Sequence, residues 1–223
     1  SAGIVYGQDP VDYVNPYIGS IGHLLTATTP DVQMPRGMIR VIPRTTPGIR
    51  DTYLAAKIYS FPVISLSNDF SAGLGTFSLM ATTGDIKVDE AANASLFDHD
   101  MEMVTPYYYS VILDDYNIEV EYTVTDHSAY YRFTFPETKN SNLLLSGLQD
   151  SELKIIGENV VEGYQTFGKS RGMSRKLYFH SEFNKPFKTF GSWTGKEITS
   201  GVKEKAGSNI GIYASFPTTK GEQ

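Results

Sequence analysis

The sequence predicts an all-β fold, a large antiparallel two-sheet β-sandwich of the supersandwich kind with little helix. Apolar and polar residues alternate with a period of two through most of the chain, as in strands with one buried and one solvated face. No stretch keeps the apolar period of an amphipathic helix over three turns. Glycines, prolines and clusters of Asn, Asp and Ser separate the apolar runs, which is typical of short strands joined by turns.

The clearest alternation covers residues 107–135, which read YYYSVILDDYNIEVEYTVTDHSAYYRFTF. Turn-forming residues at 114–117 and 126–128 divide this stretch into three segments, so it predicts a three-stranded antiparallel meander. The side chains that share its apolar face are Tyr107, Tyr109, Val111, Leu113, Ile118, Val120, Tyr122, Val124, Ala129, Tyr131, Phe133 and Phe135. We therefore assign these aromatic residues to cross-strand pairs and to the core.

Strands are also predicted on both sides of the meander. The segments are Met38–Ile42, Thr76–Ala81, Asp85–Val88, Leu143–Leu148, Leu153–Ile156, Val160–Phe167, Leu177–Phe183, Phe187–Trp193 and Ile210–Phe216. No low-complexity linker divides the chain, so we predict a single β-sandwich domain over residues 11–223. Residues 1–10 are interpreted as the remnant of a signal peptide or of a tag.

The composition excludes several classes of protein. A formal net charge of −6 without a clustered basic surface argues against nucleic-acid binding and against a basic membrane patch. No apolar run is long enough to span a bilayer, so no transmembrane segment is predicted. The 223 residues include no cysteine, which excludes disulfides, cysteine-ligated zinc and a cysteine nucleophile within them.

Motifs that carry chemistry by themselves are missing from the sequence. The histidines, His23, His99, His127 and His180, do not have the spacing of a zinc site, and we assign structural roles to the last two. There is no G-x-S-x-G, P-loop or EF-hand motif, and the glycine-rich residues 71–75 are not followed by a βαβ unit. We therefore predict no catalytic residue and no metal site in this chain.

Several short motifs occur in a fixed order along residues 11–148. VDYVNPYIGS at 11–20 is followed by Gly-His, by PRGM at 35–38, by SLFDHDMEMVTPYYYSVIL at 95–113 and by YRFTFP at 131–136. These motifs resemble a VNPFIGT-like start, a Gly/His-rich loop, Pro-Phe-Gly-Met, and Ser-x-Phe-x-His…Glu…Pro-Gly-Tyr-Tyr-x-Val-x-Leu. In this order they are similar to the N-terminal domain of glycoside hydrolase family 92, the calcium-dependent exo-acting α-mannosidases.

The resemblance implies that the chain is cut from a longer, two-domain enzyme. In the family, the N-terminal β-sandwich packs on a C-terminal (α/α)6 barrel, which carries the acid and base carboxylates and most of the Ca2+ ligands. We expect this chain to form one wall of the sugar pocket of an α-mannosidase, of the α-1,2 type, that acts on mannose-containing glycans. Its loops Gly19–Thr29 and Asp51–Asp69 would face the helical domain. The resemblance also implies export, to the periplasm or cell surface of a bacterium.

An isolated N-terminal domain should have no activity. Inverting glycosidases need an acid and a base about 6.5–9.5 Å apart, and one half of a two-domain site does not supply both. We therefore expect no hydrolysis of α-mannosides by this chain alone, and no Ca2+ requirement of its own.

Two loops depart from the family pattern. Where the family usually reads Gly-His-Gly-His-Thr-Phe-Pro-Gly, residues 22–31 read GHLLTATTPD, which keeps one histidine. Where it usually reads Gly-Phe-Ser-His-Thr-His-Leu-Ser-Gly, residues 60–68 read SFPVISLSN, so Val63 and Ser65 replace two histidines. Fewer donors for sugar hydroxyls imply a changed specificity or a weak activity of the parent enzyme. A shifted alignment of the loop is the alternative.

The resemblance singles out four residues for substrate binding. His23 is the side chain we expect to bind a sugar hydroxyl, with Gly22, Asp51 and Asn68 beside it; the alternative is that His23 caps a turn. A second function class is a stand-alone β-sandwich that binds glycans or proteins without catalysis. A helical region with paired carboxylates downstream of Gln223 would favour the glycosidase.

Overall fold

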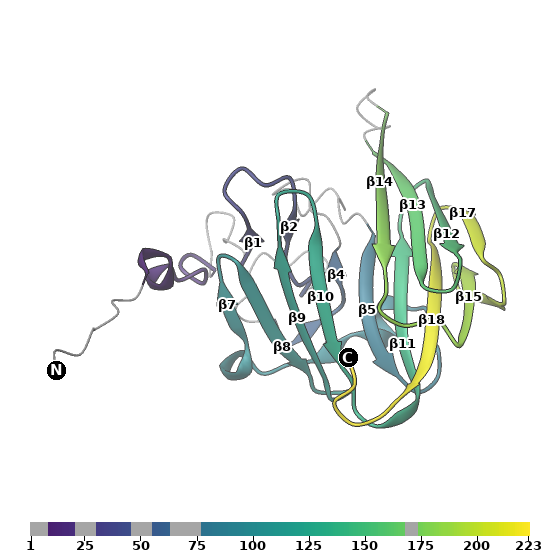
Figure 1. Cartoon of the computed structure of the whole chain (residues 1–223), viewed down its shortest axis with the longest axis horizontal. Helices are drawn as coiled ribbons and strands as arrows, with labels where there is room; N and C mark the ends of the chain where they lie inside the picture. The colour runs from purple at the N-terminus through teal and green to yellow at the C-terminus, as the bar shows by residue number, and fades with distance from the viewer. Residues whose placement is uncertain (1–8, 21–29, 46–54, 63–76, 168–173) are drawn as a thin grey trace.

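The computed structural model describes residues 9–20, 30–45, 55–62, 77–167 and 174–223, and the fold is all-β, as predicted (Figure 1). A six-stranded sheet forms one layer of the molecule. Two four-stranded sheets, which we call the tyrosine sheet and the outer sheet, lie side by side over one face of that layer. The second layer of the sandwich is thus divided into two sheets among the described residues.

The six-stranded sheet has the strand order β16–β15–β18–β11–β5–β4. Its strands are β4 (Phe61–Pro62), β5 (Ser78–Thr83), β11 (Thr138–Gly147), β15 (Thr189–Thr194), β16 (Glu197–Ser200) and β18 (Ile210–Thr218). The pairing is antiparallel, and Leu145 of β11 lies between Leu79 of β5 and Ile212 of β18. Rows of aliphatic side chains of this kind give the sheet an apolar inner face.

The tyrosine sheet has the order β10–β9–β8–β7 and confirms the predicted meander. Its strands are β7 (Met103–Thr105), β8 (Tyr108–Leu113), β9 (Ile118–Val124) and β10 (Ala129–Thr134). Strand β7 was not predicted. Tyr107 does not join the apolar face as predicted, because it lies in the turn between β7 and β8. Its side chain is exposed, and its hydroxyl donates to Asp12 at 3.2 Å.

The outer sheet has the order β14–β13–β12–β17. Its strands are β12 (Ser151–Ile156), β13 (Val160–Phe167), β14 (Arg175–Glu182) and β17 (Glu204–Gly207). The predicted strand Val160–Phe167 coincides with β13, and β14 begins two residues before its predicted start. Along β14 every second residue is exposed, which is the pattern of a sheet with one solvated face.

Short elements connect the sheets. One two-stranded ribbon pairs β1 (Val32–Gln33) with β2 (Arg40–Val41), and a second pairs β3 (Lys57–Ile58) with β6 (Ser95–Leu96). The described residues also form helical turns at Pro10–Tyr13, α1 (Glu90–Asn93) and His99–Met101.

The prediction of a strand at Asp85–Val88 is wrong. The chain leaves the sheet at Gly84, which has a φ of 84°, and Asp89 then accepts hydrogen bonds from the first amides of α1.

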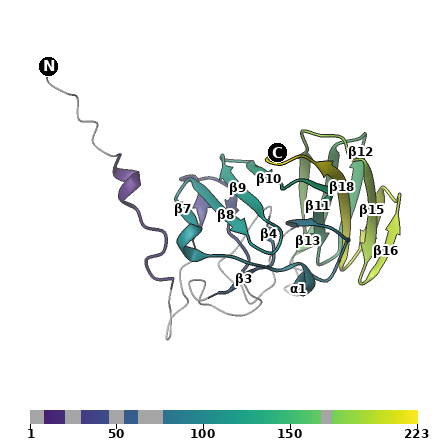
Figure 2. The same cartoon turned by 90° about the horizontal axis from the view of Figure 1, so that it is seen from below.

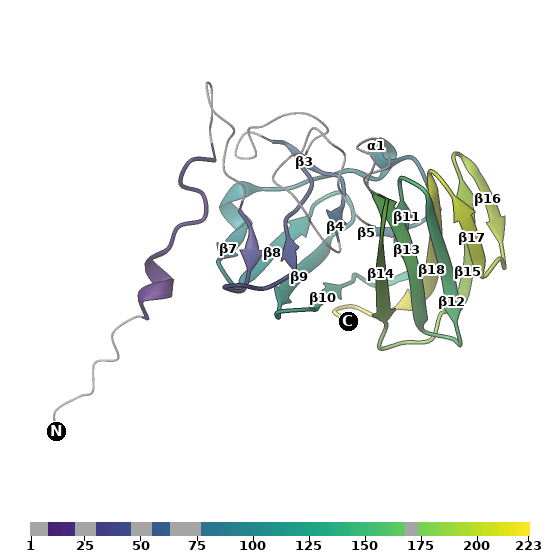
Figure 3. The same ribbon diagram turned by 90° about the horizontal axis from the view of Figure 1, so that it is seen from above.

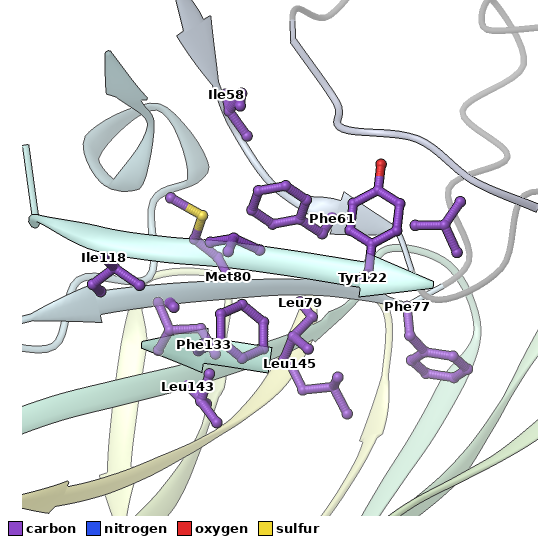
Figure 4. Packing of buried hydrophobic residues seen from close by; sticks show 14 of the residues in the cluster. Ile58, Phe61, Phe77, Leu79, Met80, Ile118, Tyr122, Phe133, Leu143 and Leu145 are labelled. Carbon is purple, nitrogen blue, oxygen red and sulfur yellow. The ribbon is translucent and has the colours of Figure 1, made fainter. Parts of the chain in front are cut away.

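The hydrophobic core lies between the two layers. Figure 4 shows Leu79, Leu143 and Leu145 of the six-stranded sheet close to Phe133 of β10, with Tyr122 of β9 beside Phe61. On the other half of the same face, Phe77 contacts Phe179 of β14, with ring centroids 4.0 Å apart. Views from below and above show the tyrosine sheet on one side and the outer sheet on the other (Figures 2 and 3). One apolar face therefore holds both four-stranded sheets.

Candidate functional site

The four residues predicted for substrate binding, Gly22, His23, Asp51 and Asn68, lie outside the described residues. Their segments can still be located through the described residues that flank them. Part of the predicted loop 51–69 is described, and it contains the short strands β3 and β4. The contacts of these flanking residues lead to one place on the tyrosine sheet.

That place is a row of three tyrosines, which we call the tyrosine row. Tyr109, Tyr122 and Tyr131 are direct cross-strand neighbours on β8, β9 and β10. The rings of Tyr109 and Tyr122 stack with centroids 4.8 Å apart, and the rings of Tyr122 and Tyr131 lie 5.5 Å apart. Because the three side chains share the apolar face, the row brings three hydroxyl groups into the interior.

A buried carboxylate is hydrogen-bonded to the first tyrosine of the row. Glu102 has a side chain that is only 3% exposed, and its Oε1 accepts a hydrogen bond of 2.5 Å from the hydroxyl of Tyr109. Its Oε2 lies 3.1 Å from Nδ1 of His99, whose Nε2 lies 2.9 Å from the carbonyl oxygen of Ala55. A buried carboxylate needs such partners, because an unpaired buried charge is costly. The network therefore ties the short helical turn 99–101 to β8 and to the segment that begins at Ala55.

The middle tyrosine has a different environment. The hydroxyl of Tyr122 is buried, and no described residue forms a hydrogen bond with it. Figure 4 shows this hydroxyl pointing away from Leu79 and Phe133, on the side of Phe61. Burial raises the pKa of Tyr122 well above its usual value, and the nearby groups Tyr131, Glu102, Asp31 and Tyr17 raise it further. A buried donor of this kind is a candidate for contact with another polar group.

Each of the three segments that carry the predicted site residues has a described flank that is linked to the tyrosine row or lies near it. Tyr17 and Asp31, on either side of residues 21–29, both influence the pKa of Tyr122. Ala55 follows residues 46–54 and contacts His99. Pro62 precedes residues 63–76, and its carbonyl oxygen accepts a hydrogen bond of 2.9 Å from the hydroxyl of Tyr131. The row is thus linked to, or close to, at least one described flank of each segment.

On the opposite face of the same sheet, a second carboxylate, that of Glu121, is held by hydrogen bonds. Arg132 donates two hydrogen bonds of 2.5 Å to the oxygens of Glu121, and the hydroxyl of Tyr108 donates to one of them at 2.5 Å. The bonds from Arg132 lower the pKa of Glu121. A carboxylate held in this way is a structural ion pair, and it is a poor candidate for a general acid or base.

The network of Glu102, His99 and the tyrosine row was not predicted from the sequence. The motif at 95–113 contains Glu102 and His99 at i, i+3 spacing, which was the available signal. Ala55, which contacts His99 in this network, is distant in sequence, so only the tertiary structure could reveal that contact.

Among the described residues, no group of three or more His, Cys, Asp or Glu residues could hold a metal ion. Within the same ranges, no helix combines the length and the apolar character that crossing a membrane requires.

Comparisons with known proteins agree with the sequence resemblance. A family model described as the glycosyl hydrolase family 92 N-terminal domain matches residues 13–223. The structure of the family GH92 α-mannosidase BT3965 from Bacteroides thetaiotaomicron, in complex with mannoimidazole, is 28% identical with a TM-score of 0.80; the match covers 95% of this chain and 31% of that one. A comparison with curated proteins found no match.

A second structure shares the fold. The family GH92 inverting mannosidase BT2199 from Bacteroides thetaiotaomicron VPI-5482 is 24% identical with a TM-score of 0.84, over 97% of this chain and 31% of that one. The chain therefore spans about a third of the length of these two proteins. Since the family model matches residues 13–223, the chain belongs to glycosyl hydrolase family 92, with the N-terminal domain of that family.

Proposed function

We propose that the chain is the non-catalytic N-terminal half of an α-mannosidase of the α-1,2 type, and that it forms one wall of the sugar pocket. The observation that carries the proposal is the 28% identity to an α-mannosidase over 95% of this chain. That match covers 31% of the other protein, so most of the relative has no counterpart in this chain.

The tyrosine row supports the position of the wall. Each of the segments that carry His23, Asp51 and Asn68 has at least one described flank that is linked to the row or lies near it. A row of stacked, cross-strand side chains of this kind is a suitable base for binding loops, because binding residues are often carried by loops on a fixed scaffold. Loops attached there can present donors and acceptors to the hydroxyl groups of mannose.

The chemistry of hydrolysis is assigned to the remainder of the enzyme. Inverting hydrolysis requires a free acid and a free base, whereas Glu102 and Glu121 are both engaged in hydrogen bonds within the domain. The described residues do not bring together three or more His, Cys, Asp or Glu residues that could hold a metal ion. We therefore place the Ca2+ ligands and the catalytic carboxylates mainly in the C-terminal (α/α)6 domain of the parent enzyme.

The first experiment separates the two halves. The full-length enzyme and the chain 1–223 are assayed on an aryl α-mannoside and on an α-1,2-linked mannobiose, with Ca2+ added and with a chelator. We expect turnover by the full-length enzyme and none by the chain alone. Turnover by the chain that disappears when its own carboxylates are mutated would show that the chemistry lies in this domain. A full-length enzyme without turnover on any α-mannoside would contradict the proposed activity.

The second experiment tests the wall. His23→Ala in the full-length enzyme should weaken substrate affinity or turnover while the melting temperature stays the same. His180→Ala is the matched control, because His180 is an exposed histidine on the outer sheet. Unchanged kinetics for His23→Ala would remove it from the pocket, and a lower melting temperature alone would assign it to structure.

The proposal includes the location of the enzyme. We place the parent protein in the periplasm or on the surface of a bacterium, where mannose-containing glycans are accessible. Fractionation of the native host, with the protein detected by antibody, tests this; detection in the cytoplasm alone would contradict it.

A further inference from the structure

A groove separates the two sheets of the divided layer. It has a volume of about 500 Å3 and runs between β10 of the tyrosine sheet and β14 of the outer sheet. Aromatic and aliphatic side chains of the core, including Leu79, Leu143 and Phe216, form its floor. We call it the edge groove, because both of its walls are edge strands in the part of the chain that the structure describes.

The wall formed by β10 presents main-chain groups to the edge groove. In the hairpin of β9 and β10, the amide of Thr125 donates to the carbonyl oxygen of Ser128. Because hydrogen-bonded and non-hydrogen-bonded pairs alternate in an antiparallel ladder, Tyr130 and Arg132 bond to β9, whereas the main chain of Tyr131 and Phe133 points away from it. Those amides and carbonyls face the groove.

The wall formed by β14 presents a matching set. The amide of Phe183, just after β14, donates to the carbonyl oxygen of Asn159, just before β13. By the same alternation, the main chain of Tyr178, His180 and Glu182 points away from β13 and into the groove. Open amides and carbonyls at two-residue intervals therefore line both sides of the groove.

One strand-like segment already enters the groove at one end. Phe135, directly after β10, forms an antiparallel bridge with Glu222, and its amide donates to the Glu222 carbonyl at 2.9 Å. On the other wall, the side-chain amide of Asn184 donates to the carbonyl oxygen of Gln223 at 3.0 Å, and Lys185 forms an ion pair with Glu222. Residues 222–223 thus lie between the two walls, paired through the main chain to the residue after β10 and contacted by side chains of the residues just beyond β14.

We propose that the edge groove is the acceptor for one extended polypeptide strand, which in the full-length protein continues from Glu222 and runs antiparallel to β10. This strand pairs with β10 on one side and β14 on the other, and it joins the tyrosine sheet and the outer sheet into one continuous layer. Its alternate side chains cover the apolar floor. The proposal concerns assembly of the domain and does not depend on its activity.

The chemistry of the groove favours a polypeptide over a sugar. A strand offers amides and carbonyls at the spacing at which β10 and β14 present theirs, so it satisfies both ladders. A glycan would leave most of those main-chain groups without a matching partner. Two open edges beside an apolar floor also form a template for unwanted pairing with other chains, which natural sheets avoid by covering such edges.

The register makes the proposal testable with a disulfide. Each step back from Phe135 along β10 corresponds to one step beyond Glu222, so Tyr130 faces the residue five positions after Glu222. Relative to the new strand this is a non-hydrogen-bonded pair, with Cα atoms about 4.5 Å apart, a distance that a disulfide can bridge. The side chain of Tyr130 is exposed, and residues 1–223 contain no cysteine to compete.

The experiment places Tyr130→Cys and a second cysteine five positions after Glu222 in the full-length protein, with other cysteines removed. We expect an intramolecular disulfide to form in air. The matched control moves the second cysteine to six positions after Glu222, where the side chain points to the opposite face and should not crosslink. Crosslinking in neither variant, equal crosslinking in both, or a disulfide between two copies of the chain would each overturn the proposal.

Hydrogen exchange tests the unmodified protein. In full-length wild type, the amides of Tyr131, Phe133 and His180 should exchange within about tenfold of the amides of the central strand β9, because a ladder protects them. The amides of Ile198 and Ser200, which point away from β15 on the edge strand β16, serve as the control and should exchange faster. Groove amides that exchange as fast as these control amides would overturn the proposal, whatever the behaviour of the cysteine variants.

Discussion

The tyrosine sheet and the outer sheet have the same number of strands and cover the same apolar face, but they differ in what their side chains do. Among the described residues, each has one contact between a histidine Nδ1 and a glutamate associated with it. Directly before β7 of the tyrosine sheet, the contact joins His99 to Glu102, whose side chain is 3% exposed and also accepts a hydrogen bond from Tyr109. In the outer sheet it joins His180 to Glu162, with side chains 58% and 49% exposed. The glutamate of this pair is therefore buried beside one sheet and exposed on the other.

This difference indicates which of the two sheets depends more on contacts between distant parts of the chain. The inner face of the tyrosine sheet is linked to segments that lie far away in sequence, directly to Pro62 and through Glu102 and His99 to Ala55. The outer sheet is built mainly from neighbouring hairpins, and its β14 is exposed at every second residue. We therefore expect the tyrosine sheet to be sensitive to substitution and the outer sheet to be tolerant.

The largest effect is expected for the middle of the tyrosine row. Tyr122→Ala removes a fully buried ring that packs on Tyr109, Tyr131 and Phe61, so it should lower the free energy of unfolding by about 3–5 kcal/mol. Tyr178→Ala on the outer sheet is the matched control; the residue is 67% exposed, and we expect a loss below about 1 kcal/mol. Urea unfolding of both variants measures the difference, and equal losses would contradict the contrast between the sheets.

The next effect concerns the buried carboxylate. Glu102→Ala leaves the hydroxyl of Tyr109 without its acceptor, and we expect a loss of about 1–3 kcal/mol in the free energy of unfolding. Glu102→Gln keeps one acceptor oxygen and should recover part of this loss. Calorimetry and urea unfolding provide the measurement. A Glu102→Ala variant as stable as wild type would show that the network is not structural.

Alkaline pH should weaken the same region. Burial raises the pKa of Tyr109, Tyr122 and Tyr131 above the usual value. Above about pH 10 these tyrosines ionise in the unfolded state but keep their protons when folded, so the unfolded state binds fewer protons and stability falls as pH rises. Each such tyrosine contributes up to about 1.4 kcal/mol per pH unit.

Tyr122→Phe isolates one of these contributions. Its hydroxyl has no hydrogen-bond partner among the described residues, so the variant should be close to wild type at pH 7. Between about pH 10 and pH 11.5 it should lose stability less steeply than wild type, because one ionisable group is gone. Melting temperatures across this range measure both slopes. Parallel curves for the two proteins would assign the alkaline loss to other groups.

Local pattern was enough to predict much of the fold. The alternation from Ile118 to Phe135 gave the strands and their buried faces, because the period of two is a property of the strand itself. Strands of two to four residues, such as β3, β7 and β16, were not predicted, because so short a segment carries too little pattern. Asp85–Val88 has suitable residues but follows the turn at Gly84, and the strand prediction failed there.

The site was less accessible to sequence reasoning. His23, Asp51 and Asn68 came from family resemblance, and they remain predictions. The Glu102 network depends on contacts with Tyr109 and with Ala55, which is far away in the sequence. The division of the second layer depends on which strands become neighbours, and alternation within a strand does not determine that.

The smallest effect is expected for the exposed pair of the outer sheet. Glu162 and His180 are cross-strand neighbours on β13 and β14, with Oε1 and Nδ1 2.9 Å apart. Because both side chains are largely solvated, their attraction is screened, and Glu162→Gln should change the free energy of unfolding by less than about 1 kcal/mol. Any loss should shrink further in 1 M NaCl, whereas the loss in Glu102→Ala should persist, since it comes from a buried hydroxyl rather than from a screened charge. Urea unfolding at low and high salt measures both. A large, salt-insensitive loss in Glu162→Gln would place this pair in a buried environment of the assembled protein and would remove the contrast between the two sheets.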